Sequence, residues 1–223
     1  MTTPVFLFFG LIGLLLLAVL AALAWRFASN RTSIPCPSWL SWVVEFNNPF
    51  FKSYNAPTLI QRLDLQPGMR VLDVGCGPGR LTIPAAEQVG PQGEVVAVDL
   101  QPGMLRQAQK KAQASNLKNI RFLQVKVGEG KLELSQADRA LLVTVLGEIP
   151  DRAAALKEIF EALKPGGLLS VTEIIVDPHY QSRRTILDLA GAVGFRARQF
   201  YGNRLAFTLI LEKPALPGSG RSS

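Results

Sequence analysis

The feature that most constrains the fold is an apolar strand that leads directly into a glycine-rich turn and then a helix. Residues 70–74 read RVLDV, and glycines follow at positions 75, 77 and 79 before the helix expected from Arg80. Glycine has no Cβ, so the backbone of such a turn can approach a ligand closely. The first turn of the helix also offers free N–H groups and a positive dipole end to a carboxylate. We therefore predict a ligand site at this turn.

Strands and helices alternate through the rest of the chain, from Gln66 to Glu212. The expected strands are residues 70–74, 94–99, 120–125, 138–145, 168–176, 195–201 and 204–212, and the expected helices are residues 80–89, 102–116, 151–163 and 182–193. Such alternation predicts a parallel sheet that is covered on both faces. Gly202-Asn203 lies between the last two strands and predicts a hairpin turn, so one terminal strand should run antiparallel.

A glycine-rich turn after a strand also occurs in dinucleotide-binding proteins. Their fingerprint requires Gly or Ala at its sixth position, where this chain has Arg80. A pyrophosphate would also face the like charge of Asp73 at the end of the strand. These features and the terminal hairpin disfavour a nicotinamide-dependent oxidoreductase, which stays an alternative.

Two motifs carry a family resemblance that covers roughly residues 66–212. The sequence VLDVGCGPGRL at 71–81 closely resembles the VLDVGCGxGxL motif of class I S-adenosylmethionine-dependent methyltransferases, in their type 11/25-like domain. LKPGGLL at 163–169 resembles the turn that precedes strand five in that family. The resemblance implies an α/β, Rossmann-like, seven-stranded methyltransferase fold, a mostly parallel sheet with a terminal antiparallel hairpin. It also implies S-adenosyl-L-methionine as the cofactor.

The same resemblance implies the cofactor site. Asp73 ends the first strand, where its carboxylate can hold the α-amino group of the cofactor. Asp99 ends the second strand, where the family has an acidic residue that accepts hydrogen bonds from the ribose hydroxyls. Leu100 and Met104 are expected to line the adenine side. The whole expected set is Asp73, Gly75, Cys76, Gly77, Gly79, Asp99, Leu100, Met104 and Val127.

The end of the third strand departs from the family pattern. Many relatives carry an acidic residue there that meets the adenine amino group, and this chain has Lys126 at that place. We expect either the backbone of Val127 or the carboxylate of Glu129 to make the contact instead.

Two residues are candidates for catalysis, because ligands bind at the carboxyl ends of the strands in such sheets. Glu148 follows strand four, and His179 follows strand five. Methyl transfer from a sulfonium needs mainly proximity and alignment, plus a base where the acceptor must lose a proton. Each residue also has a structural explanation, as a loop carboxylate or as a solvated histidine. Glu173, a carboxylate within strand five, and Tyr54, which precedes the domain, are further residues to consider.

No metal site is expected. His179 is the only histidine of the chain, and the spacing of Cys36 and Cys76 fits neither a metal motif nor a disulfide framework. Both cysteines are expected to be free thiols, as in a reducing compartment.

The N-terminal segment has the properties of a membrane anchor. Residues 4–25 contain no charged residue, and as a helix these 22 positions would span about 33 Å, close to a bilayer core of about 30 Å. Arg26 and Arg31 follow the run, whereas no Lys or Arg precedes it. The positive-inside tendency then predicts a single-pass membrane protein whose catalytic domain is cytoplasmic. A cleaved signal peptide is the main alternative, because Ala22-Leu23-Ala24 resembles a cleavage site.

The chain is accordingly divided into four segments. We expect a transmembrane anchor over residues 1–28, a juxtamembrane connector and N-terminal helix over 29–65, the methyltransferase domain over 66–213, and a disordered tail over 214–223. The connector is rich in aromatic residues, which fits either a helix in the membrane interface or packing on the domain.

The location of the domain suggests the acceptor. The net charge is +7, but the basic residues are scattered and not interleaved with aromatic ones, so no nucleic acid is expected as a partner. We expect methyl transfer to a small or lipid-like acceptor at the cytoplasmic membrane face, with the lipid bilayer as partner. A soluble or protein acceptor stays open, as does a non-catalytic S-adenosylmethionine-binding membrane protein.

Overall fold

The computed structural model describes residues 54–215 without a gap, together with ten positions nearer the N-terminus: 8–10, 12–14, 16, 17, 20 and 24. These ten positions are helical. In this described part of the chain, no helix is both long enough and apolar enough to cross a membrane. Most of the expected anchor, connector and tail lies outside the described residues. The structure therefore does not support the transmembrane helix, which stays a prediction.

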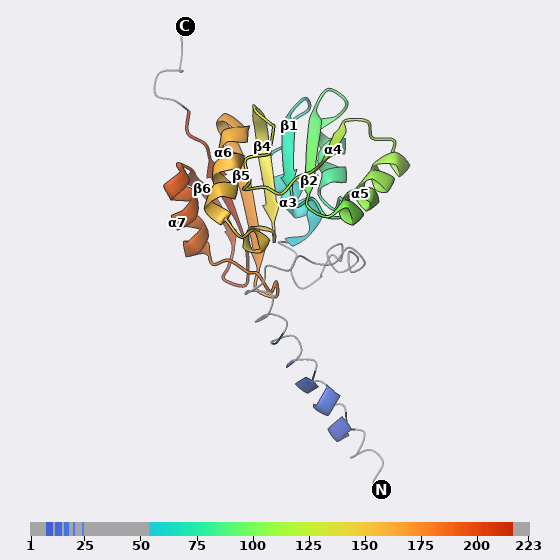
Figure 1. The fold of residues 1–223 in the computed structure, drawn as a ribbon, viewed down its shortest axis with the longest axis vertical. Coiled ribbons are helices and arrows are strands. Elements are labelled where there is room, and N and C mark those ends of the chain that lie inside the picture. The colour runs from blue at the N-terminus through green and yellow to red at the C-terminus, as the bar shows by residue number, and fades with distance from the viewer. Residues whose placement is uncertain are drawn as a thin grey trace.

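A seven-stranded sheet forms the centre of the domain, in the order β3-β2-β1-β4-β5-β7-β6 (Figure 1). The strands are β1 (Arg70–Val74), β2 (Glu94–Asp99), β3 (Ile120–Gln124), β4 (Ala137–Val143), β5 (Leu163–Ile174), β6 (Arg196–Gly202) and β7 (Ala206–Glu212). Strands β1 to β5 are parallel to one another, and β7 runs antiparallel to both β5 and β6. The predicted Rossmann-like sheet with its terminal hairpin is confirmed.

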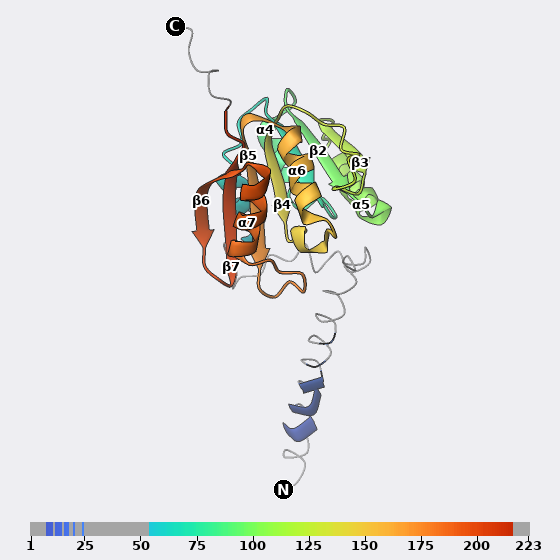
Figure 2. The same ribbon diagram turned by 60° about the vertical axis from the view of Figure 1, so that its left-hand side comes forward.

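Helices cover both faces of the sheet, which is why its central strands are almost continuously apolar. The helices are α3 (Ala56–Arg62), α4 (Thr82–Val89), α5 (Pro102–Ala114), the 3-10 turn η3 (Leu146–Glu148), α6 (Arg152–Ala162) and α7 (Arg183–Val193). Figure 2 shows α6 and α7 side by side on one face. On the other face, α3 and α4 pack on β1 and β2 through a cluster that includes Leu59, Ala85 and Val71.

Two boundaries differ from the sequence-based prediction. Helix α4 begins at Thr82 rather than Arg80, because the glycine turn continues to Gly79, which has a φ of 85°. Strand β5 begins at Leu163 rather than Leu168, so the Pro165-Gly166-Gly167 sequence lies inside the strand as a register shift against β4. The distant residue Lys213 makes this possible, since its backbone carbonyl accepts from Gly166 N at 2.7 Å and its N–H donates to Gly167 O at 2.9 Å.

A buried carboxylate fixes the loop that follows β3. Glu158 on α6 is 8% exposed and accepts hydrogen bonds from the backbone N–H groups of Gly128 and Leu132, the latter at 2.6 Å. Gly128 has a φ of 98°, and a Cβ there would lie 3.2 Å from Asp151 O at the start of α6. The conformation of the loop after β3 therefore depends on one side chain of α6.

We expect Glu158→Ala to lower the free energy of unfolding by about 2–4 kcal/mol, because it leaves two buried amides without an acceptor. Chemical denaturation of the full chain measures the change, with Glu161→Ala on the exposed side of the same helix as control. Equal stability of the two variants would contradict this role for Glu158.

Candidate active site

The glycine turn folds back onto the end of β2 through its backbone amides. Gly75 N and Cys76 N both donate to Val98 O, at 2.8 and 2.9 Å. Gly77 N donates to Asp99 Oδ2 at 2.9 Å. Three consecutive backbone N–H groups of the turn thereby bind the carboxyl end of the neighbouring strand.

The three glycines of the turn serve different purposes, although all have positive φ, of 67°, 54° and 85° in order. A Cβ on Gly75 would collide with the side chain of Val145, and one on Gly79 would lie 3.0 Å from Ala108 Cβ. A Cβ on Gly77 would meet nothing within 4 Å. Gly75 and Gly79 are therefore required for packing, whereas Gly77 presents bare backbone to open space.

Two partly desolvated carboxylates lie beside this backbone. Asp73 is 4% exposed, and its Oδ2 accepts from Thr82 Oγ1 at 2.6 Å. Burial raises the pKa of Asp73 to about 6, the Thr82 hydrogen bond opposes this rise, and the charge of Asp99 adds to it. Burial also raises the pKa of Asp99, whose Oδ1 accepts from Gln101 N at 2.8 Å. Each carboxylate oxygen has more than one lone pair, so both groups can accept further hydrogen bonds.

Comparison with known proteins decides what this arrangement is. A family model described as "Methyltransferase domain" matches residues 65–194, which is more than half of the chain. The chain belongs to this methyltransferase family.

Curated relatives and solved structures agree with the family. The demethylmenaquinone methyltransferase of Lactobacillus johnsonii is 36% identical over 117 residues, covering 51% of this chain and 47% of the relative. That of Lactococcus lactis is 38% identical over 114 residues, covering 51% and 45%. The chain thus spans about half the length of these curated relatives. A SAM-dependent methyltransferase from Aquifex aeolicus superposes with a TM-score of 0.71 over 80% of this chain and 99% of that chain, and at 20% identity it shows the shared fold.

The methyltransferase domain takes S-adenosylmethionine as its cofactor, and the site fits this ligand. The cofactor carries a positive α-amino group and two ribose hydroxyls, which match an anionic Asp73 and an anionic Asp99. A cationic neighbour also favours the ionised form of Asp73, against its raised pKa. The open side of Gly77 leaves room for the approach of the ligand to the backbone.

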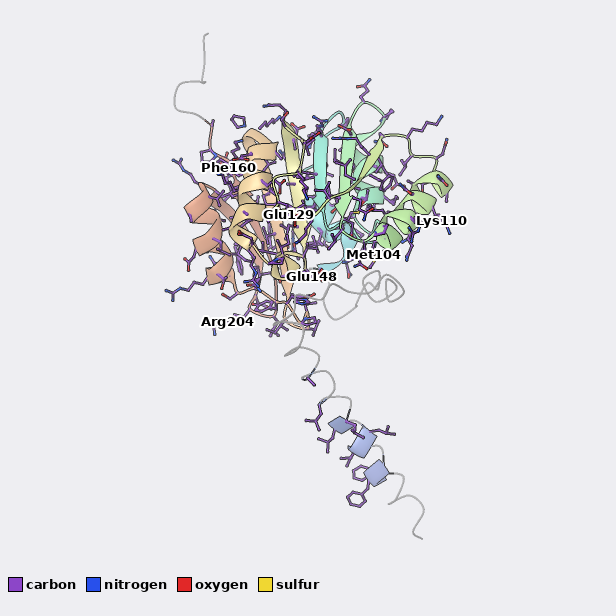
Figure 3. All side chains as sticks on the ribbon, viewed as in Figure 1. Met104, Lys110, Glu129, Glu148, Phe160 and Arg204 are labelled. Atoms are coloured by element: carbon purple, nitrogen blue, oxygen red, sulfur yellow. The ribbon has the colours of Figure 1, made fainter. Side chains whose placement is uncertain are left out.

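The apolar residues expected around the adenine are placed unequally. Leu100 is 48% exposed, directly after Asp99, where a planar base can cover it. Met104, labelled in Figure 3, is 3% exposed within the packing of α5, so its side chain is not an open lining. Cys76 and Val127 are buried as well, at 5% and 7%. Burial raises the pKa of the Cys76 thiol well above its ordinary value, so this thiol is a packing group.

Lys126, which stands where many relatives carry an acidic residue, forms an ion pair with Glu129. Lys126 and Lys131 both bind the carboxylate of Glu129, each at 2.8 Å. These hydrogen bonds, chiefly that from Lys126, lower the pKa of Glu129 to about 2. Glu129 is thus engaged by two lysines, which leaves the backbone of Val127 as the expected adenine contact.

On the acceptor side, the structure brings the two catalytic candidates together. Gly147 of η3 packs so closely on the backbone of His179 that any Cβ would overlap it. His179 Nδ1 lies 3.9 Å from Glu148 Oε1 and 3.9 Å from Asp177 Oδ1. The His179 side chain is 4% exposed, whereas that of Glu148 is 23% exposed. Glu148 is therefore the more accessible of the two candidates, and His179 is buried beside it.

Glu173, which the sequence analysis named as a further residue to consider, lies close to the same cluster. It is 1% exposed, its Oε2 accepts from Gln181 N at 3.1 Å, and its Oε1 has no hydrogen-bond partner among the described residues. Burial raises the pKa of Glu173 to about 8, the charges of Asp177 and Glu148 add to the rise, and Arg152 opposes it. The raised pKa favours the protonated form of Glu173 at neutral pH.

Tyr54 closes the site from the N-terminal side. Its hydroxyl lies 3.3 Å from Thr144 Oγ1, and the Arg80 guanidinium carbon lies 4.3 Å from its ring centroid. Arg80 also donates to Tyr54 O. Thr144 has a φ of 53°, which is rare for a β-branched residue and is typical of functional sites. Arg80, the residue that argued against a dinucleotide site, therefore joins the cofactor turn to the segment before α3.

We expect Gly77→Ala to weaken S-adenosylmethionine binding by about tenfold or more, which corresponds to about 1.4 kcal/mol, because its methyl group occupies the open approach. Titration calorimetry measures the affinity. Gly68→Ala is the matched control, since Gly68 also has a positive φ, of 83°, and also has open space around it, but lies before β1. Equal cofactor affinity of the two variants would refute the assignment of this backbone to the cofactor.

We expect Glu173→Gln to remove a pH-dependent loss of stability. Between the ordinary pKa of 4.5 and the raised pKa of about 8, the folded protein holds a proton on Glu173 that the unfolded chain has released. Stability from this group therefore falls as pH rises through that window, by at most about 1.4 kcal/mol per pH unit. Denaturation midpoints at several pH values should show that the stability of the variant relative to the wild type increases as pH rises. The exposed control Glu87→Gln should show no such trend, and a parallel trend in both would contradict the prediction.

Proposed function

We propose that this protein transfers the methyl group of S-adenosylmethionine to a small, lipid-like acceptor at the cytoplasmic face of a membrane, and that a quinone ring is the first acceptor class to test. The observation that carries the methyl transfer is the bare backbone at Gly77, set between Asp73 and Asp99 in a domain of the methyltransferase family.

The acceptor class is supported by the relatives. Those of Lactobacillus johnsonii and Lactococcus lactis are named demethylmenaquinone methyltransferases, and demethylmenaquinone is a quinone. The shared region spans about half of each relative. A quinone-like acceptor for this chain is therefore our proposal.

The membrane location is supported by the N-terminal segment. Residues 4–25 carry no charge, and basic residues follow this run. The large apolar side chains at the described positions are exposed, for example Phe8 at 61%, Leu14 at 67% and Leu17 at 65%. Apolar helical positions that nothing in the described chain covers fit a single-pass anchor with a cytoplasmic catalytic domain.

The residues of the site divide the work as follows. When bound, S-adenosylmethionine supplies a methyl group that is already activated on a sulfonium. Asp73 holds the α-amino group, Asp99 accepts from the ribose, and Gly77 lets the ligand approach. Glu148 meets the acceptor and takes a proton where the methylated atom must lose one. Burial raises the pKa of Glu173 and so favours its neutral form near Glu148.

We test this with the full chain reconstituted in vesicles that contain demethylmenaquinone, using S-adenosylmethionine labelled on its methyl group. Label should enter the organic phase, and Glu148→Gln should lower kcat by about 10²-fold with an unchanged dissociation constant for the cofactor. Glu133→Gln, at an exposed position outside the site, is the control.

The same experiment separates the alternatives. A membrane extract in place of the quinone extends the search to other lipids, and label that appears only in a water-soluble product would refute a lipid-like acceptor. Cofactor binding without any transfer would favour a non-catalytic role. Binding of NAD in place of S-adenosylmethionine would favour an oxidoreductase.

A further inference from the structure

Exposed apolar side chains of the catalytic domain gather in two places. In the continuous part of the chain that the structure describes, four large apolar residues are exposed: Leu100, Val176, Phe200 and Leu205. Leu100 follows Asp99 and belongs to the cofactor side. The other three surround the end of β5 and the β6–β7 hairpin, and we call them the apolar corner.

A backbone hydrogen bond joins the two chain segments at the centre of the apolar corner. Ile175 N donates to Leu205 O at 2.7 Å, so the residues after β5 run beside the hairpin turn. Val176 is 66% exposed and Leu205 is 54% exposed. Single exposed apolar residues need no explanation, but neighbouring ones at the rim of a site indicate an interaction surface.

Arginines flank the apolar corner. Arg204 precedes Leu205, and its backbone carbonyl accepts from the Tyr180 hydroxyl at 3.0 Å. The guanidinium carbon of Arg183 lies 4.2 Å from the ring centroid of Phe200. The next residue, Arg184, has a side chain that is 93% exposed and lies 3.8 Å from Asp188. Apolar side chains beside arginines, on a chain of net charge +7, match the chemistry of an anionic lipid surface.

The apolar corner also lies at the same end of the domain as Glu148, the candidate for contact with the acceptor (Figure 3). Figure 3 shows Glu148 and Arg204 toward the same lower end of the domain, whereas Phe160 lies toward the other end. Tyr54 contacts Thr144 directly after β4, so the chain enters the domain at this end as well. The 28 residues from 26 to 53 can reach roughly 90 Å when extended, so an anchor alone does not decide which face meets the bilayer.

We propose that the apolar corner docks on an anionic lipid bilayer and holds the mouth of the acceptor site against it. The inference rests on the proposed function, because docking matters only if the acceptor resides in the membrane. The acceptor then passes from the bilayer to Glu148 without crossing water.

Lipid quenching of a fluorophore tests the docking. The full chain, with Cys36→Ser to leave only the buried Cys76, carries the fluorophore on Leu205→Cys or, as control, on Gln92→Cys in the exposed turn before β2. It is reconstituted in vesicles of phosphatidylcholine and phosphatidylglycerol with brominated acyl chains. We expect quenching at position 205 to exceed that at position 92 several-fold and to fall when phosphatidylglycerol is left out. Equal quenching at both positions, or none at position 205, would overturn the proposal.

A charge variant extends the test. Val176→Glu should reduce quenching at position 205, whereas Ala192→Glu, near the far end of α7, should leave it unchanged. If Val176→Glu instead breaks up a dimer in detergent, a second copy of the chain covers the apolar corner and the proposal fails.

Methyl transfer in detergent and in vesicles, measured on the same variants, separates the two proposals. Val176→Glu should leave transfer in detergent unchanged and slow it in vesicles. If Val176→Glu no longer docks but still transfers methyl groups in vesicles at the wild-type rate, the inference is overturned and the proposed function stays intact. Label only in a water-soluble product would overturn the proposed function, whatever the quenching shows.

Discussion

The end of β2 holds the rest of the cofactor site in place. Parallel pairing aligns Val74 with Val98, so the two strands finish at the same level. The Val98 carbonyl then takes two amides of the glycine turn, and the Asp99 carboxylate takes a third. One hydrogen-bonded junction thereby sets the path of the turn and the positions of Asp73 and Asp99. Burial raises the pKa of both carboxyl groups, and a bound cation would favour their ionised forms.

The acceptor side uses a different means of holding its polar groups. Glu148, Asp177 and His179 lie close together because Gly147 allows η3 to pack on the backbone of the β5–α7 loop. Glu173 lies beneath them, and burial raises its pKa to about 8. The raised pKa of Glu173 favours its neutral form, which limits the negative charge that is buried in this cluster.

Sequence patterns predicted the sheet well because they reflect local physics. The bounds of β1 and β2 follow from apolar runs, and Asp151 caps α6 as its residue type suggests, by accepting from Ala154 N at 2.9 Å. The errors come from contacts between distant segments. Pro165-Gly166-Gly167 looks like a stop, and only the pairing with Lys213 shows that the strand passes through it. The place of Met104 on the adenine side stays a prediction, and the structure adds only that the residue is buried in the packing of α5. The engagement of Glu129 by two lysines depends on the loop that Glu158 holds.

Arg80 connects the cofactor turn to the segment that precedes α3. At this position a dinucleotide-binding turn needs a small residue for close helix packing. Here the larger side chain reaches out of the turn, stacks on Tyr54 and binds its carbonyl. The cofactor turn is therefore in direct contact with the first residue of the continuous described chain, which leads back to the expected anchor. Any force that shifts this N-terminal segment acts on Arg80 and Thr144, and so on both sides of the site.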